Sequence, residues 1–322
     1  MRDLWVLTAV AMMVPLGAGH ARAQPGDWPV LRGPYLGQKP PGATPEVFAP
    51  GIISTEAAEG CSHFSNDDRL FLFAQTRSSQ DGVFIMEQEN GVWGEPHLAP
   101  FSAGGHDWDF TLTPDGTTVL VSSGRPTSEG GSPEEDYRIW VSERIDDGWS
   151  PPRLLPAPVN TGQHDSYPSV TADGTLYFFS RRDGGLGLGD IYRSKRVDEQ
   201  YTEVENLGGP INTEHHDLDP FIAPDESYLV FSSDRPGGYG SDDLYVAFRK
   251  KGGTWTEPVN MGPSINSPRE EYIPSMSLDG EQFFFTTNKS GQRDIYWVDA
   301  SVIEELRPVG PGGAIEATRI GH

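Results

Sequence analysis

One short block of sequence recurs five times along this chain of 322 residues, and this repetition limits the possible folds more than any other feature. Each copy begins with an acidic residue, reaches a turn aspartate eight positions later, and has a serine or asparagine five positions before the acid. The acids are Glu59, Asp107, Asp165, Asp217 and Glu271. The turn aspartates are Asp67, Asp115, Asp173, Asp225 and Asp279, and the short polar residues are Ser54, Ser102, Asn160, Asn212 and Asn266. Because the three columns keep their register without gaps, we expect five copies of one structural unit.

The sequence pattern of each copy predicts four strands. The run after the turn aspartate, such as Leu176-Tyr177-Phe178-Phe179, is apolar on both faces, which is typical of a strand sandwiched between neighbouring sheets. The last segment of a copy carries an aromatic residue and often a proline, as in Trp255-Thr256-Glu257-Pro258. Proline belongs on sheet edges, so this segment should be the outermost strand. Successive turn aspartates are 48 to 58 residues apart, which is a blade length for a β-propeller.

The two ends of the repeat region complement each other. Residues 45–54 match the outermost strand of the other copies but precede the first copy, and the last copy ends after Asp294–Val298 without such a strand. Pairing between these segments would close the ring and remove its open edge. We therefore predict an all-β fold: a β-propeller over residues 45–306 with five four-stranded blades, the N-terminal strand closing the last one. Six blades are the alternative, and Ala300–Leu306 looks helical rather than extended.

The terminal segments differ from the repeats. Residues 1–23 have a basic start, a short apolar run and Ala21-Arg22-Ala23, the pattern of a cleaved secretory signal peptide. We expect a periplasmic or extracellular protein that does not insert into a membrane after cleavage. Residues 24–44 and 307–322 are rich in proline and glycine and are expected to be flexible tails.

The net charge of the chain restricts the classes of partner that it can bind. A formal net charge of −23 disfavours nucleic acids and anionic membrane surfaces, and it favours cationic ligands, metal ions or basic partner surfaces. Cys61 is the only cysteine, so an intramolecular disulfide is excluded and stability must come from the core. We expect a monomer.

Several runs resemble a known repeat. Ser169–Gly174 together with Phe178-Phe179-Ser180, and Ser232–Gly238 followed by Asp242–Tyr245, look like the WD40-like (PD40) repeat of TolB-type propellers. The resemblance covers residues 45–300 and implies a propeller. It says little about function, because propellers host binding proteins, lyases, glycosidases and peptidase gating domains. TolB propellers usually have six blades, so five blades weaken any analogy to the partner-binding role of TolB.

The columns also suggest a site. Because the acid column starts the innermost strand of each blade, Glu59, Asp107, Asp165, Asp217 and Glu271 are expected to form a ring near one mouth of the central channel. His106, His164 and His216 directly precede three of these acids, so we predict that they hold a divalent metal ion. The alternative is structural, since a basic residue follows the second strand in every blade and buried acid–base pairs would then recur for architectural reasons. These basic residues are Arg77, Arg125, Arg182, Arg235 and Lys289.

Residues that break the repeat are candidates for a binding face. Trp108 lies beside a column acid and could stack on a sugar or pack on a partner, and the insertion 127–136 is acidic and loop-like. Our preferred hypothesis is an exported scaffold that binds a protein or glycan partner and performs no chemistry. The alternative is a metal-assisted lyase or glycosidase at the channel mouth. Oligogalacturonate lyases resemble TolB-type propellers and bind a metal through histidines, but the acidic charge argues against a polyanionic uronate substrate.

Overall fold

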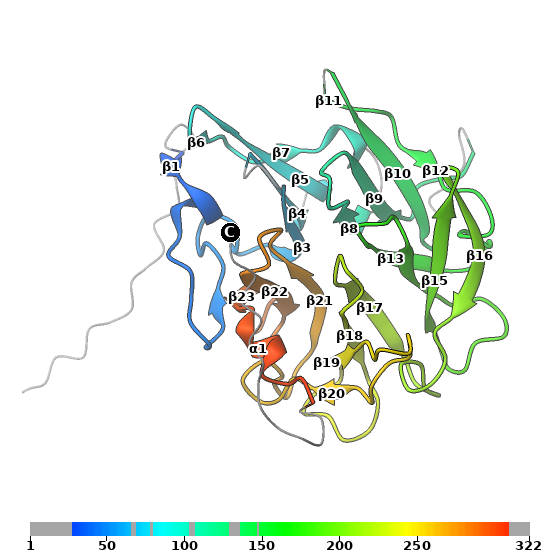
Figure 1. The fold of residues 1–322 in the computed structure, drawn as a ribbon. Coiled ribbons are helices and arrows are strands. Elements are labelled where there is room, and N and C mark those ends of the chain that lie inside the picture. The colour runs from blue at the N-terminus through cyan, green and yellow to red at the C-terminus, as the bar shows by residue number, and fades with distance from the viewer. Residues whose placement is uncertain are drawn as a thin grey trace, which may run out of the picture.

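The computed structural model describes residues 28–65, 69–77, 80–102, 107–128, 136–146 and 148–308. Five antiparallel sheets are arranged around a central axis, like the blades of a propeller (Figure 1). The innermost strands of neighbouring blades contact one another around the whole ring. The prediction of an all-β, five-bladed propeller is therefore confirmed, and the described residues contain no sixth blade.

The first two blades have a divided outer strand. Blade 1 contains β3 (Ala58–Phe64), β4 (Leu70–Arg77), β5 (Gln80–Glu89), β6 (Val92–Trp93) and β7 (His97–Leu98). Blade 2 contains β8 (Asp107–Leu112), β9 (Thr118–Ser123), β10 (Arg138–Ile145), β11 (Gly148–Trp149) and β12 (Arg153–Leu154). Both short outer strands of each blade pair with its third strand, so they take the place of one edge strand.

The other three blades have four strands each. Blade 3 contains β13 (Asp165–Val170), β14 (Leu176–Ser180), β15 (Asp190–Val197) and β16 (Gln200–Asn206). Blade 4 contains β17 (Asp217–Ile222), β18 (Tyr228–Ser233), β19 (Asp243–Phe248) and β20 (Val259–Asn260). Blade 5 contains β21 (Glu271–Met276), β22 (Gln282–Thr287), β23 (Asp294–Asp299) and, from the start of the chain, β2 (Glu46–Val47).

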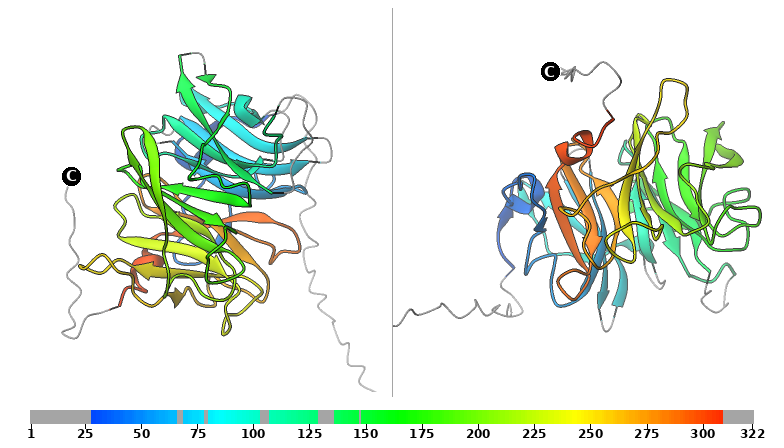
Figure 2. Two further views of the ribbon diagram at one scale, coloured as in Figure 1. Left: turned by 90° about the vertical axis from the view of Figure 1, so that its right-hand side faces the viewer. Right: turned by 90° about the horizontal axis from the view of Figure 1, so that it is seen from below.

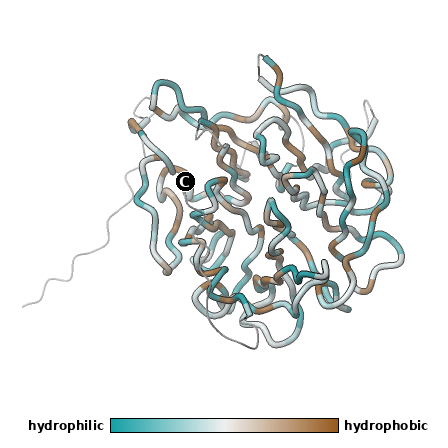
Figure 3. The backbone as a smooth tube through the Cα atoms, in the orientation of Figure 1, coloured by the Kyte–Doolittle hydropathy of each residue, from teal (hydrophilic) through white to brown (hydrophobic). Residues whose placement is uncertain are grey.

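Apolar side chains fill the spaces between blades. The buried residues form five clusters, and the hydrophobic segments of the chain follow the strands (Figure 3). This explains the strands that are apolar on both faces, because Phe178 packs toward blade 2 while Tyr177 packs toward blade 4. Each blade therefore depends on both of its neighbours for burial.

The N-terminal strand closes the ring as predicted. Glu46 pairs with Trp297 and Val47 with Tyr296, so β2 becomes the outer strand of blade 5 beside β23 (Figure 2). Directly after β2, Phe48 is fully buried among aromatic rings of blades 5 and 1. Its ring centroid lies 5.1 Å from that of Trp297 and 5.5 Å from that of Phe71.

The segment before β2 differs from expectation. Residues 24–44 were expected to be flexible, but the described part, from Trp28 onward, is folded against the propeller. β1 (Leu31–Arg32) pairs with β6 of blade 1, and the 3₁₀ helix η1 (Pro34–Gly37) follows. The Tyr35 hydroxyl donates a hydrogen bond of 2.5 Å to Asp279 of blade 5. Leu31, Tyr35 and Leu36 are buried, so three large side chains fix a segment that is rich in proline and glycine.

The end of the described chain is also folded. The short helix α1 (Ser301–Glu304) confirms the helical interpretation of this region, and Arg307 lies over the ring of Phe248. Residues 1–23, predicted as a signal peptide, and residues 309–322 lie outside the described residues. Within the described part, no helix is long and apolar enough to cross a membrane.

Ring closure yields a first prediction. Phe48→Ala should lower the free energy of unfolding by about 3–5 kcal/mol, because it removes a fully buried ring that joins blades 5 and 1. Urea unfolding of the purified protein measures this change. Val30→Ala is the control, since Val30 is 71% exposed, and an equal effect of both substitutions would contradict the closure account.

Candidate functional site

The acid column occupies equivalent places at the start of the innermost strands, and its side chains are buried inside the blades. Asp107, Asp165 and Asp217 are at most 1% exposed. Each accepts a hydrogen bond from the arginine that follows the second strand of its own blade. The guanidinium-to-carboxylate distances are 2.7 Å for Arg125–Asp107, 2.9 Å for Arg182–Asp165 and 2.6 Å for Arg235–Asp217. Three blades therefore contain the buried acid–base pair that was the structural alternative.

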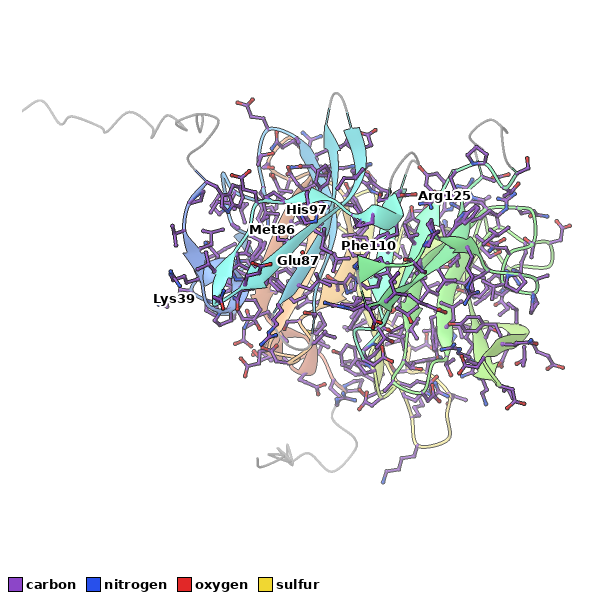
Figure 4. The ribbon with its side chains drawn as sticks, turned by 90° about the horizontal axis from the view of Figure 1, so that it is seen from above. Lys39, Met86, Glu87, His97, Phe110 and Arg125 are labelled. Atoms are coloured by element: carbon purple, nitrogen blue, oxygen red, sulfur yellow. The ribbon has the colours of Figure 1, made fainter. Side chains whose placement is uncertain are left out.

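Aromatic rings complete these pairs. The Arg235 guanidinium lies 5.0 Å from the ring centroids of both Phe231 and Tyr245, and Arg182 lies 4.9 Å from two rings of blade 3. In blade 2, Arg125 lies over Trp140 (Arg125 is labelled in Figure 4). The same arginines also donate to backbone carbonyls of the segment that enters the blade. The pair thus links the entry segment, the innermost strand and the aromatic rings of the second and third strands.

In the two blades with glutamate, the described hydrogen-bond donors to the carboxylate are neutral side chains. Glu59 accepts hydrogen bonds from Gln75 and Thr55, at 2.6 and 2.7 Å, and burial raises its pKa to about 7. Glu271 accepts from Thr287 and Ser267, both at 2.6 Å. Within the described residues, no group of three histidine, cysteine or acidic side chains is arranged to hold a metal ion.

The described structure does not test the predicted histidine site. His106 lies outside the described residues. His164 packs against the rings of Tyr137 and Phe179, and burial lowers its pKa to about 4. The backbone N–H of His216 donates to Asp234. A metal ion shared by the three histidines stays a prediction.

Trp108 lies at the channel, beside a cationic side chain. The Arg293 guanidinium lies 5.5 Å from the ring centroid of Trp108 and 5.3 Å from that of Tyr272. This stack joins blades 2 and 5 across the channel mouth. Of the insertion 127–136, residues 129–135 lie outside the described residues.

The side chains that line the channel come two positions after the column acids. In every blade the innermost strand shifts its register there, and a β-bulge of this kind re-aims a side chain. The residues turned toward the axis are Cys61, Asp109, Tyr167, Asp219 and Ile273. Together with His63 and their neighbours they enclose a cavity of about 20 Å³, which is room for about one water molecule.

Two carboxylates share this cavity. Asp109 is 5% exposed and Asp219 is 4% exposed, and the Oδ1 atom of each has no hydrogen-bond partner among the described residues. Burial raises the pKa of Asp219 to about 8, and burial together with the charge of Asp219 raises that of Asp109. His63 lies in the same wall, where burial lowers its pKa to about 4. The neighbouring Cys61 thiol donates to the Phe110 carbonyl at 3.0 Å (Phe110 is labelled in Figure 4).

The sequence contained a signal for this channel position. The column acid is nearly constant, whereas the residue two positions later changes from one copy to the next. A repeat position that serves the fold is expected to stay constant. The position two residues after the column acid varies, so its residues are not required by the shared blade structure.

A second feature is a groove between blades 2 and 3, with a volume of about 1280 Å³. Its floor is formed by Leu120, Val141, Leu155 and Val170, all of which are buried members of the cluster between these blades. Five acidic residues line it: Asp115, Glu143, Asp173, Asp198 and Glu199. Its two arginines, Arg153 and Arg196, form 2.9 Å ion pairs with Glu143 and Glu199. The groove is therefore apolar at its floor and acidic at its rim.

Comparison with known proteins identifies similar folds. No protein-family model matches the sequence, and no curated protein matches it. Solved structures do: a TolB-designated protein of Agrobacterium tumefaciens is 16% identical with a TM-score of 0.47, over 72% of this chain and 71% of the other. TolB of Acinetobacter baumannii is 14% identical with a TM-score of 0.47, over 76% of this chain and 55% of TolB. An α-L-arabinofuranosidase of Lactobacillus brevis is 11% identical with the same TM-score, over 76% of this chain and 90% of the enzyme.

These are likenesses of fold at low identity. The chain spans little more than half the length of Acinetobacter TolB. The five blades follow from the strand pairing described above.

The buried ion pairs yield a prediction. Arg235→Met should lower the free energy of unfolding by about 3–5 kcal/mol, because it leaves the Asp217 carboxylate buried without its cationic partner. Arg153→Met, which removes an exposed pair, should cost less than about 1 kcal/mol. Urea unfolding of both variants tests the difference, and equal effects would show that the buried pair has no special role.

The buried histidine yields a pH prediction. Since the pKa of His63 in the folded protein is about 4, below its unfolded value of roughly 6.5, the unfolded state takes up the proton first as the pH falls. The contribution of neutral His63 is complete above pH ~6.5 and is lost on acidification. Between pH 7 and 4.5, His63→Gln should therefore lose roughly 2–3 kcal/mol less stability than the wild type. Urea unfolding at both pH values measures this, and parallel losses would contradict it.

Proposed function

We propose that this chain is an exported binding scaffold that holds a basic, extended polypeptide segment of a partner protein in the groove between blades 2 and 3. The observation that carries the proposal is the groove itself, which combines a volume of about 1280 Å³ with a buried apolar floor and an acidic rim. Protein recognition commonly combines an apolar centre with a polar rim.

Charge indicates the class of partner. The five groove acids outnumber its two arginines, and each arginine is already paired with one of the acids. The whole chain carries a formal charge of −23, so its field adds to that of the groove. A basic segment gains both long-range attraction and local pairing, whereas an acidic one is repelled.

The groove suits a polypeptide better than a glycan. Sugar-binding sites commonly stack sugar rings on aromatic side chains, and Tyr201 is the single aromatic residue among those that line this groove. Lysine and arginine side chains are long and flexible, so they can reach carboxylates at different places along the rim and form charge-assisted hydrogen bonds with them. Export, inferred from residues 1–23, would place the partner in the periplasm or outside the cell.

The channel offers little support for the enzyme alternative. A site for a small-molecule substrate commonly has a volume of about 300–1,000 Å³, whereas the channel residues enclose about 20 Å³. The acids proposed as catalytic candidates are committed to hydrogen bonds within their blades. We therefore assign recognition to the outer surface of the propeller.

A binding experiment tests the groove. Fluorescently labelled peptides of equal length, one lysine- and arginine-rich, one neutral and one glutamate-rich, are titrated with the protein and followed by fluorescence anisotropy. We expect only the basic peptide to bind, with an affinity that falls as salt increases. The double variant Asp198→Lys with Glu199→Lys should weaken binding about tenfold or more, because it reverses two charges at the groove rim.

The matched control is Glu87→Lys with Glu89→Lys, which makes the same charge change on exposed positions of blade 1 (Glu87 is labelled in Figure 4). If both double variants weaken binding equally, attraction is a property of the whole charge and the groove is not the site. Binding of the acidic peptide, or no binding of the basic one, would contradict the proposal outright.

A further inference from the structure

The axial cavity is lined by two buried carboxyl groups that have no salt-bridge partner within the described protein. Asp109 comes from blade 2 and Asp219 from blade 4, and both side chains line the cavity. Each is at least nine-tenths buried, and each has one carboxylate oxygen without a hydrogen-bond partner among the described residues. In the described part of the chain, neither carboxylate takes part in a salt bridge of the kind that holds Asp107, Asp165 and Asp217.

Such an arrangement is costly without a counter-ion. A carboxylate removed from water needs a cation or a full set of hydrogen-bond donors. Asp219 receives one long backbone hydrogen bond, 3.3 Å from the Ile273 N–H, on its other oxygen. The charge of Arg293 acts on both carboxyls, but its side chain is exposed and lies against the rings of Trp108 and Tyr272. Asp109 and Asp219 are therefore a pair of buried acids that line one small cavity, and each has one carboxylate oxygen without a described partner.

The chemistry of the cavity selects the ion. Two carboxylates supply a charge of about −2 and hard oxygen donors, which suit Ca²⁺ or Mg²⁺ rather than a transition metal. Mg²⁺ keeps several of its water molecules, and a cavity of about 20 Å³ has room for about one. Ca²⁺ accepts flexible ligand sets that include carboxylate, carbonyl and hydroxyl oxygens.

We propose that the axis of the propeller is a Ca²⁺ site in which Asp109 and Asp219 are the charged ligands. Backbone and hydroxyl oxygens of the bulged strands and water complete the ligand set. With two charged ligands, we expect weak binding in the range of extracellular calcium modules, about 10⁻⁴–10⁻³ M. This site is separate from the groove and from the predicted histidine site, so it does not depend on the proposed function.

The ion would also have a structural effect. Blades 2 and 4 are not adjacent in the ring, so an ion held by both carboxylates links opposite sides of the propeller through its centre. Because Ca²⁺ binds the folded protein and not the unfolded chain, it stabilises the fold by mass action.

The test is thermal unfolding of the full-length protein after removal of bound ions with a chelator. Addition of Ca²⁺ well above its dissociation constant should raise Tm by about 2–5 °C, and the same concentration of Mg²⁺ or twice that of Na⁺ should raise it far less. Isothermal titration calorimetry with Ca²⁺ should show one site per chain.

Two isosteric variants locate the site. Asp109→Asn and Asp219→Asn should each abolish the Ca²⁺-dependent rise in Tm, while their Tm without Ca²⁺ equals or exceeds that of the wild type because a buried charge has been removed. Asp183→Asn, at an exposed carboxylate outside the groove and the cavity, should keep the full response. The assignment is wrong if the wild type does not respond to Ca²⁺, if Mg²⁺ and Na⁺ act equally, or if the two variants keep the response.

Discussion

The buried pairing of an acid with an arginine is the interaction on which each blade is built. Asp217 begins the innermost strand of blade 4, and Arg235, which binds it, follows the second strand and lies on aromatic rings of the second and third strands. A buried ion pair of this kind adds little net stability to the fold. It restricts the geometry of the blade, because either charge buried without the other is strongly destabilising. In the glutamate blades, the described hydrogen-bond donors to the carboxylate are neutral: Gln75 donates to Glu59, and Thr287 donates to Glu271.

This constraint divides the residues of the innermost strand into two roles. The side chain of the column acid points into its own blade. The bulge that follows directs the side chain two positions later toward the axis. As a result, the channel is lined by residues such as Asp109 and Tyr167, which differ between copies, and it is almost filled. The channel residues leave room for about one water molecule, whereas the groove between blades 2 and 3 is far larger, apolar at its floor and acidic at its rim.

Much of the fold could be predicted because repetition reports on architecture directly. The columns gave the number of blades, and the unmatched outer strand at residues 45–54 gave the closure that Glu46 and Val47 make. The packing of Leu31 and Tyr35 could not be predicted, because three buried side chains decide the structure of a segment whose composition is that of a loop. Asp109 and Asp219 were also missed: alternation along a strand assigns side chains to faces, and one bulge reverses the assignment. The strand pattern therefore predicted the column acids at the channel, whereas the residues two positions later line it.

The central claim is that this propeller recognises a partner with its blade 2–blade 3 groove and not with its channel mouth. Hydrogen–deuterium exchange of the protein, with and without a saturating basic peptide, tests that claim most directly. The account predicts slower exchange in segments that line the groove, within residues 113–120, 153–157 and 196–201. Protection centred instead on Trp108, Tyr272 and Arg293 at the channel mouth, with the groove unchanged, would contradict it.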